Sequence, residues 1–298
     1  MIDTGKFFPA VSIVMPTYNS AAFISETVDS IRNQTFKNWE LIIIDDGSDD
    51  GTQEIIEQLK DERVTCYSIL RSGIISKVRK VGIEKASAAF IAFIDSDDLW
   101  AVTKLEEQVS ALEQNKDAGF CLTGGYNFIQ PGVPGDFFYR QKEGMKHGDL
   151  FPSFFRSELA VYLQALMFRK ECMAALAPFK ETDNDIDFIL RLAKNFQGLI
   201  LYKPLFFRRI HDTNYSNLNW KKNYDKGINA IQSYAATTDA EITRTAFFKL
   251  YINYGEDCLK HGEKRKAIQN FSRAWRYKPF SIVPFKKTVK SMFSSFKR

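Results

Sequence analysis

Over its first 115 residues the chain alternates short apolar runs with amphipathic stretches. The amphipathic stretches carry apolar residues at helical spacing, for example Ile24, Val28 and Ile31. The apolar runs are rich in β-branched residues and have the near-continuous hydrophobicity of strands covered on both faces. Four such strands are predicted: 11–15, 40–44, 64–70 and 90–94. This alternation predicts a doubly wound α/β sheet.

Beyond residue 116 the pattern is mixed and then becomes helical. Residues 185–195 have the spacing of an amphipathic helix, and residues 198–211 predict paired strands interrupted at Pro204. From about residue 220 onward the pattern favours helices, with a stop at Pro279. We therefore predict an α/β domain at 1–218 and a helical C-terminal region at 219–298.

Composition adds limits on the class of protein. A chain of 298 residues with 45% hydrophobic residues can bury a full core. No signal-peptide pattern is seen at the N-terminus, and the longest central apolar run is too short to cross a bilayer. Four widely separated cysteines have no metal-ligand spacing and predict reduced thiols: Cys66, Cys121, Cys172 and Cys258. We expect a cytoplasmic protein that is soluble or peripheral on a membrane.

Charge is distributed unevenly along the chain, although the net charge is only +5. Residues 1–100 carry 16 acidic and 10 basic residues, whereas residues 260–298 carry 12 basic residues and a single acid, Glu263. Basic tails bind nucleic acid or anionic lipid. A solvated surface explains the same charges, so composition leaves these alternatives open.

Polar stretches follow three of the predicted strands. They are PTYN at 16–19, DDGSDDGT at 45–52 and DSDDLW at 95–100. The carboxyl ends of parallel strands share one edge of a sheet, where ligands bind, so we expect the three stretches to converge. An acidic cluster there has the oxygen ligands that a hard divalent cation prefers, and the cation would offset the repulsion between the carboxylates.

Helix capping is the alternative for part of this pattern. Asp and Ser are favoured at helix N-caps, so Asp45, Asp46 and Ser48 have a second interpretation as caps of the helix that contains Ile55. Capping by Asp97 or Asp98 needs only one acceptor and leaves Asp95 unexplained. The joint placement at three strand ends therefore favours a binding site.

In this order, PTYN, DDGS and DSDD resemble the motifs of the family 2 glycosyltransferases. The resemblance is dense over residues 10–115 and scattered to about residue 216. It implies a GT-A type, Rossmann-like nucleotide-sugar-binding fold with a mixed, mainly parallel sheet. It also implies Mg²⁺ or Mn²⁺, a nucleotide-sugar donor, UDP-linked by expectation, and inversion at the anomeric carbon.

The same resemblance assigns roles to particular residues. Tyr18 falls where the family stacks the nucleotide base, and Asp46 where a carboxylate hydrogen-bonds that base. Seven residues are expected at the nucleotide-sugar: Thr17, Tyr18, Asp45, Asp46, Arg79, Asp95 and Ser96. Three are expected at the metal: Asp97, Asp98 and His211.

Asp185 aligns with the catalytic carboxylate that deprotonates the acceptor hydroxyl. Asn184 replaces the usual Glu beside it, and Lys80 replaces the Asn of a family motif before the fourth strand. A helix cap is the alternative for Asp185. The two departures also leave open a second function, a nucleotide-sugar-binding protein without turnover.

The last fifteen residues have the pattern of a basic amphipathic helix. Lysines alternate there with apolar residues, at Phe285, Val289, Met292, Phe293 and Phe296. Such a helix lies on an anionic membrane surface or docks on its own core, and the pattern leaves both open. The resemblance implies a saccharide or lipid-linked saccharide acceptor in surface polysaccharide synthesis. Nucleic acid is not an expected partner, because no recognised module accompanies the basic residues.

Overall fold

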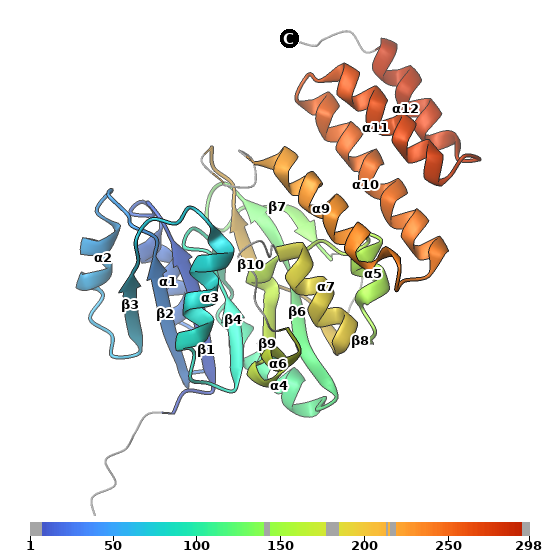
Figure 1. The fold of residues 1–298 in the computed structure, drawn as a ribbon. Coiled ribbons are helices and arrows are strands. Elements are labelled where there is room, and N and C mark those ends of the chain that lie inside the picture. The colour runs from blue at the N-terminus through green and yellow to red at the C-terminus, as the bar shows by residue number, and fades with distance from the viewer. Residues whose placement is uncertain (1–7, 140–143, 177–184, 213, 215–218, 294–298) are drawn as a thin grey trace, which may run out of the picture. The chain divides into compact units, whose positions relative to one another are not determined.

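The computed structural model describes residues 8–139, 144–176, 185–212, 214 and 219–293 (Figure 1). The chain divides into two compact units. The first comprises Met1–Leu150 and Val161–Asp212, and the second comprises Phe151–Ala160 and Thr213–Arg298. Residues 151–160 thus group with the C-terminal helices, whereas the predicted division at 218 and 219 assigned them to the first domain. The extent of each functional domain stays a prediction.

A mixed sheet forms the core of the first unit. Its path is β3-β2-β1-β4-β9-β6-β10-β5, with β7 beside β6 and β8 beside β10. In this path the neighbouring strands β3, β2, β1 and β4 are parallel to one another, and β9 is antiparallel to both β4 and β6. The strands are β1 Val11–Thr17, β2 Trp39–Asp45, β3 Val64–Ser68, β4 Phe90–Phe93, β5 Leu99–Trp100, β6 Ala118–Phe128, β7 Pro134–Phe138, β8 Met145–Gly148, β9 Leu166–Arg169 and β10 Gln197–Arg209.

Helices alternate with the first four strands, as the apolar spacing predicts. In Figure 1, α3 lies in front of β1 and β2, against which it packs. Every side chain of β1 is buried, and β2 is nearly so, because the sheet is covered on both faces. The helices of this unit are α1 Ile24–Arg32, α2 Thr52–Gln58, α3 Ile75–Lys85, α4 Lys104–Gln114, α6 Met173–Leu176 and α7 Asp185–Asn195, with short 3₁₀ turns at Leu163–Ala165 and Lys170–Cys172. The predicted fold class is confirmed.

The prediction of paired strands interrupted at Pro204 is wrong. β10 is one strand that passes through Pro204 and pairs with β6 on both sides of it. The register between them shifts between Leu201 and Pro204 and again between Pro204 and Phe206. Bulges of this kind accommodate a residue without a donor N–H, so the strand bends and continues.

The second unit is helical, as predicted for the C-terminal region. Its helices are α5 Phe151–Phe155, α9 Trp220–Ala235, α10 Ala240–Lys260, α11 Lys264–Tyr277 and α12 Ile282–Phe293. Asp239 caps α10, because its carboxylate accepts hydrogen bonds from the N–H groups of Glu241 and Ile242. Close packing of α10 on α11 depends on Gly255, where an added Cβ would lie 2.3 Å from the Phe271 ring.

Among the described residues, no helix combines the length and the apolar character that crossing a bilayer requires.

Candidate functional site

The three polar strand ends meet at one edge of the sheet, as the strand pattern predicts. Thr17 pairs with Asp45 at the ends of β1 and β2, and the Asp46 N–H donates to the Thr17 carbonyl oxygen at 2.9 Å. Asn19 joins the two loops further out. Its side-chain amide donates to Asp49 at 2.8 Å and accepts from the Asp49 N–H at 3.0 Å. The loops therefore form one continuous surface.

Tyr18 and Asp46 are linked through Arg71. The Arg71 guanidinium lies 3.4 Å from the centre of the Tyr18 ring and forms an ion pair with Asp46. Asp46 also accepts the N–H groups of Ser72 at 2.7 Å and Gly73 at 2.9 Å. Burial raises the pKa of Asp46, but these hydrogen bonds and the Arg71 charge lower it by more, so its net pKa is below the usual value. An aromatic ring, a cation and a carboxylate thus lie together at this edge.

The loop at 45–52 is held by Asp45 and does not use it as a helix cap. The fully buried Asp45 carboxylate accepts from the Ser48 N–H at 3.3 Å and from the Gln53 side chain at 2.5 Å. The residue at the N-cap of α2 is Gly51, and no side chain caps that helix. Thr103, which also makes no side-chain cap bond, occupies the N-cap of α4. The capping alternative is therefore wrong for Asp45, Asp46, Asp97 and Asp98.

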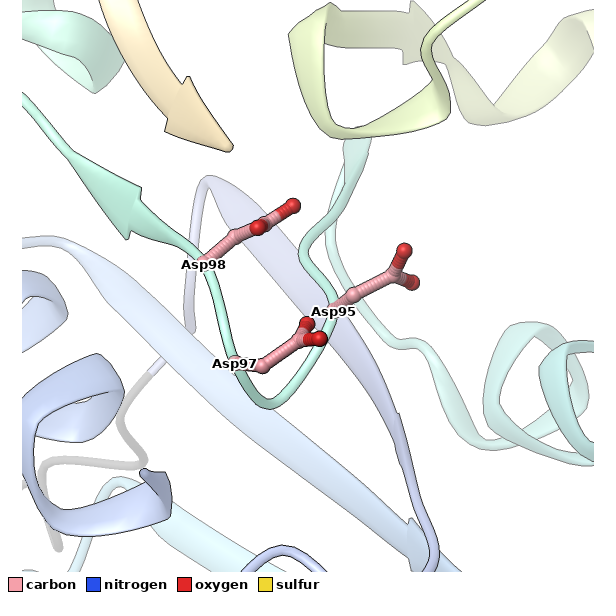
Figure 2. A group of neighbouring side chains, drawn as sticks. All are labelled: Asp95, Asp97 and Asp98. Atoms are coloured by element: carbon pink, nitrogen blue, oxygen red, sulfur yellow. The ribbon is translucent and has the colours of Figure 1, made fainter. Parts of the chain in front are cut away.

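Figure 2 shows Asp95, Asp97 and Asp98 projecting from the single turn between β4 and β5. One carboxylate oxygen from each lies within 4.8 Å of the others. Burial and the Asp95 charge raise the pKa of Asp97. Burial and the charges of Asp97 and Asp95 hold the pKa of Asp98 well above its usual range. The turn thus gathers three acidic side chains, and burial together with the neighbouring charges disfavours the ionised form of two of them.

Hydrogen bonds fix two of these carboxylates. Asp98 is almost fully buried, and its Oδ1 accepts the Arg209 N–H at 2.9 Å. Its Oδ2 is buried and has no hydrogen-bond partner within the described part of the chain. Asp97 Oδ2 lies 2.9 Å from His211 Nε2, and the His211 ring packs on Phe23 at 4.7 Å between centroids. A buried carboxylate oxygen without a partner, beside two more carboxylates and an imidazole, fits a divalent cation.

Arg79 joins this turn to the predicted base. It is only 2% exposed, and its guanidinium donates to Asp95 at 2.8 Å and to Asp185 at 2.5 Å. Burial lowers the pKa of Arg79, and the charges of Asp185 and Asp95 raise it by more, so the guanidinium stays charged. The Gln164 side chain donates to the other oxygen of Asp95. One buried fork thus sets the positions of two carboxylates that are 90 positions apart in sequence.

The remaining residues that the sequence analysis named lie in the turn between β4 and β5, on β1, on the helices α3 and α7, or outside the described residues. The Ser96 hydroxyl lies 2.6 Å from that of Ser20, and the Ser96 carbonyl accepts the Thr27 hydroxyl at 2.9 Å. The buried Thr17 hydroxyl has no partner within the described residues. Asp185 begins α7, and Asn184 lies outside the described residues. The Lys80 ammonium lies 3.9 Å from the Glu84 carboxylate on the same helix.

Sequence reasoning missed Arg71, Gln164 and the role of Arg209. Arg209 donates through Nε to the Asp97 carbonyl oxygen at 2.8 Å and through its terminal nitrogen to Glu26 at 2.5 Å. Arg71 had a usable signal, because it directly follows a predicted strand at the ligand-binding edge. Gln164 had none, since it lies in a short turn far from any motif.

Comparison with known proteins tests this interpretation. A family model described as Glycosyl transferase family 2 matches residues 12–159, which include all three polar strand ends. The chain carries a glycosyltransferase family 2 domain. Among curated relatives it is 29% identical to TuaG of Bacillus subtilis (strain 168), described as a teichuronic acid biosynthesis glycosyltransferase, over 72% of this chain and 84% of TuaG.

A second relative covers less of the molecule. Over 44% of its length, this chain is 36% identical to WfgD of Escherichia coli, which is described as a UDP-Glc:alpha-D-GlcNAc-diphosphoundecaprenol beta-1,3-glucosyltransferase. This match spans about half the length of WfgD, 52%. Among solved structures, S. aureus TarS 1–349 in complex with UDP-GlcNAc has a TM-score of 0.71 at 16% identity, over 94% of this chain and 88% of TarS 1–349. That likeness confirms the expected GT-A type fold.

Proposed function

We propose that this enzyme transfers a sugar from a UDP-linked donor to a hydroxyl of a saccharide or lipid-linked saccharide, with inversion at the anomeric carbon. The observation that carries the proposal is the buried Arg79 fork, which holds Asp185 at one end and the Asp95–Asp98 turn at the other. TuaG and WfgD, by their names, serve teichuronic acid synthesis and act on a diphosphoundecaprenol-linked sugar. They support an acceptor used in surface polysaccharide synthesis.

The nucleotide would bind at the ends of β1 and β2. The ring of Tyr18, which is 41% exposed, and the Arg71 guanidinium provide a stacking surface, and Asp46 provides an acceptor for the base. The buried Thr17 hydroxyl, which has no partner within the described residues, is available to the same ligand. These contacts would hold the donor before any bond breaks.

Asp97, Asp98 and His211 would hold Mg²⁺ or Mn²⁺. The fit rests on the partnerless buried Asp98 oxygen and on the three carboxylates within 4.8 Å. A bound divalent cation would stabilise the negative charge that develops on the leaving nucleoside diphosphate. Arg209 and Arg79 keep the turn in place through the Asp97 carbonyl and the Asp95 carboxylate.

Asp185 would act as the general base on the acceptor hydroxyl. Its side chain is 40% exposed, so an acceptor can reach it, while Arg79 fixes its orientation. Donor and acceptor groups are thus positioned by the same guanidinium. We further propose a cytoplasmic enzyme that associates peripherally with the membrane through its C-terminal region, where a lipid-linked acceptor would be held.

The test is Asp185→Asn, assayed with UDP-sugars and saccharide acceptors in the presence of Mn²⁺. We expect turnover to fall by about 10²–10⁴-fold, because a positioned general base contributes that much, while UDP binding measured by calorimetry stays unchanged. Asp187→Asn is the matched control, since Asp187 lies on the same helix and pairs with Arg191 at 3.0 Å. Near-wild-type turnover of Asp185→Asn would remove this residue from the role. Nucleotide binding by the wild type without any product would favour the binding protein without turnover.

A further inference from the structure

Figure 1 shows the turn that joins α11 to α12. This turn and the adjoining helix ends expose an unusual set of apolar side chains. Phe280 is fully exposed, and four further large apolar residues nearby in sequence are each more than one third exposed. Together they are called here the α11–α12 tip: Trp275, Phe280, Ile282, Val283 and Phe285. Single exposed apolar residues are normal on protein surfaces, whereas five within eleven positions mark an interaction site.

The tip has a defined local structure. The Trp275 indole N–H donates to the Pro279 carbonyl oxygen, and the Ser281 N–H donates to the Lys278 carbonyl oxygen at 3.0 Å. Pro284 is buried and α12 packs against α11, so the turn is tied to the helices on both sides. The fold itself therefore leaves these apolar side chains in solvent.

Positive charge surrounds the tip. Residues 264–298 contain eleven lysines and arginines and no acidic residue. Lys278 pairs with Glu241 at 3.2 Å, and Lys287 pairs with Glu256. Arg276 and Lys286 are exposed and form no ion pair within the described part of the chain. At least two cations thus flank the apolar side chains with their charge uncompensated.

We propose that the α11–α12 tip inserts into the interfacial layer of an anionic membrane. Aromatic and aliphatic side chains enter the boundary between headgroups and acyl chains, while arginine and lysine remain at the anionic headgroups. A protein partner fits less well, because the centres of protein interfaces are depleted of charged residues, especially lysine. The inference rests on the proposed membrane association and refines it, because it centres the contact on the α11–α12 tip.

This location differs from the amphipathic tail predicted from sequence. That pattern used Phe285, Val289 and three later residues, of which Phe296 lies outside the described residues. Val289 is half-buried, whereas Phe280 and Ile282, which the tail pattern did not include, are exposed. Among the side chains whose exposure the structure describes, the exposed apolar surface therefore begins before the predicted helix face and includes Phe285 of that face.

Flotation of the full chain with vesicles tests the proposal. The vesicles contain about one third phosphatidylglycerol in phosphatidylcholine, or phosphatidylcholine alone. We expect the protein to bind the anionic vesicles only, and salt to weaken this binding. Phe280→Ser should weaken it about tenfold, because the variant lacks the apolar ring that would be partly buried in the membrane. Arg276→Ser with Lys286→Ser should weaken binding by about tenfold or more, since each cation near such a surface contributes.

Matched controls come from the first unit. Ile129→Ser removes another exposed apolar side chain and Lys116→Ser another exposed lysine, and both should bind vesicles as the wild type does. Phe280→Ser should leave the fold unchanged, because the Phe280 side chain is fully exposed. Equal binding of the Phe280→Ser variant and the wild type, or no binding of the wild type to anionic vesicles, would overturn the proposal. A dimer in sedimentation that Phe280→Ser dissolves, with no vesicle binding, would assign the tip to a second copy instead.

The vesicle assay is independent of the transfer reaction. Asp185→Asn is expected to bind vesicles like the wild type, and Phe280→Ser to retain turnover on a water-soluble acceptor. Vesicle binding without transfer would count against the proposed function alone, and transfer without vesicle binding would count against the membrane surface alone.

Discussion

The two units of this chain use charge in opposite ways. In the first unit the charges of the candidate site are bonded to fixed partners, and several of them are buried: Asp98 and Arg79 are nearly inaccessible, and Asp46 is held by two backbone N–H groups and Arg71. In the second unit Arg276 and Lys286 are exposed on the surface. A buried charge needs fixed partners, because burial in a low dielectric is costly, whereas an exposed charge acts through its field.

This difference indicates what kind of ligand or surface each unit can bind. Fixed carboxylates and donors suit a small ligand with a defined shape, such as a nucleoside diphosphate with its cation. Exposed cations beside apolar side chains suit an extended anionic surface. Substitutions in the first unit should therefore have large and geometry-dependent effects, and those in the second unit smaller and additive ones.

Asp97→Asn should have the largest effect. The change keeps the size of the side chain but removes the charge of a proposed cation ligand, so we expect turnover to fall by about 10²–10³-fold in Mn²⁺. Calorimetry with UDP should show that the gain in affinity on adding Mn²⁺ is lost. Asp117→Asn is the control, because Asp117 is exposed and contacts only His147, at 3.2 Å, among the ion pairs of the described residues. Metal-dependent UDP binding that survives Asp97→Asn would exclude Asp97 as a ligand.

Arg79→Lys should have the next largest effect. Lysine keeps the charge but lacks the planar fork, so it cannot hold Asp95 and Asp185 together in the same geometry. We expect kcat to fall by about 10–100-fold, with UDP affinity within about threefold of the wild type. An equal loss of UDP affinity would instead support direct contact between Arg79 and the donor, which was the expectation from family resemblance. Arg63→Lys, which alters an arginine paired with Asp61 at 2.9 Å, should leave kcat unchanged.

Much of the fold was predictable because the strands of the first unit are buried on both faces. Continuous runs such as 40–44 and 90–94 predict strands covered on both faces, and the amphipathic stretches between them predict helices that join parallel strands. The prediction of a strand break at Pro204 was wrong, because the bulges that accommodate this proline depend on the neighbouring strand β6 and have no local sequence signal. The grouping of residues 151–160 with the C-terminal helices has the same long-range origin.

The carboxylates of the candidate site could be predicted from the sequence, whereas most of the residues that hydrogen-bond to them could not. Asp95, Asp97 and Asp98 stand out because three acids follow a buried strand, and His211 was found through resemblance. Gln164 and Arg209 contact the turn at 95–98 from positions 69 and 112 residues away from their partners in sequence. Contacts of this kind are set by the pairing order of β9, β6 and β10, which local patterns do not encode.

Lys104 gives the sharpest test of the contrast between buried and exposed cations. It is fully buried in the first unit, where its ammonium donates to Gln108 at 2.5 Å and lies 4.1 Å from the centre of the Trp100 ring. Burial lowers the pKa of Lys104 to about 7. We expect Lys104→Met to raise the free energy of unfolding at pH 7 by about 1–3 kcal/mol, because the replacement is apolar and of similar size. Urea unfolding, followed through the tryptophans, measures this.

The advantage of Lys104→Met should depend on pH. Between pH 7 and the usual lysine range the unfolded wild type binds this proton and the folded wild type does not, so wild-type stability rises with pH. The difference between the variant and the wild type should therefore be largest at and below pH 7 and shrink by pH 9. Lys286→Met is the exposed control and should change the free energy of unfolding by less than about 0.5 kcal/mol at either pH. An effect of Lys104→Met that is independent of pH would mean that Lys104 stays charged in the folded chain.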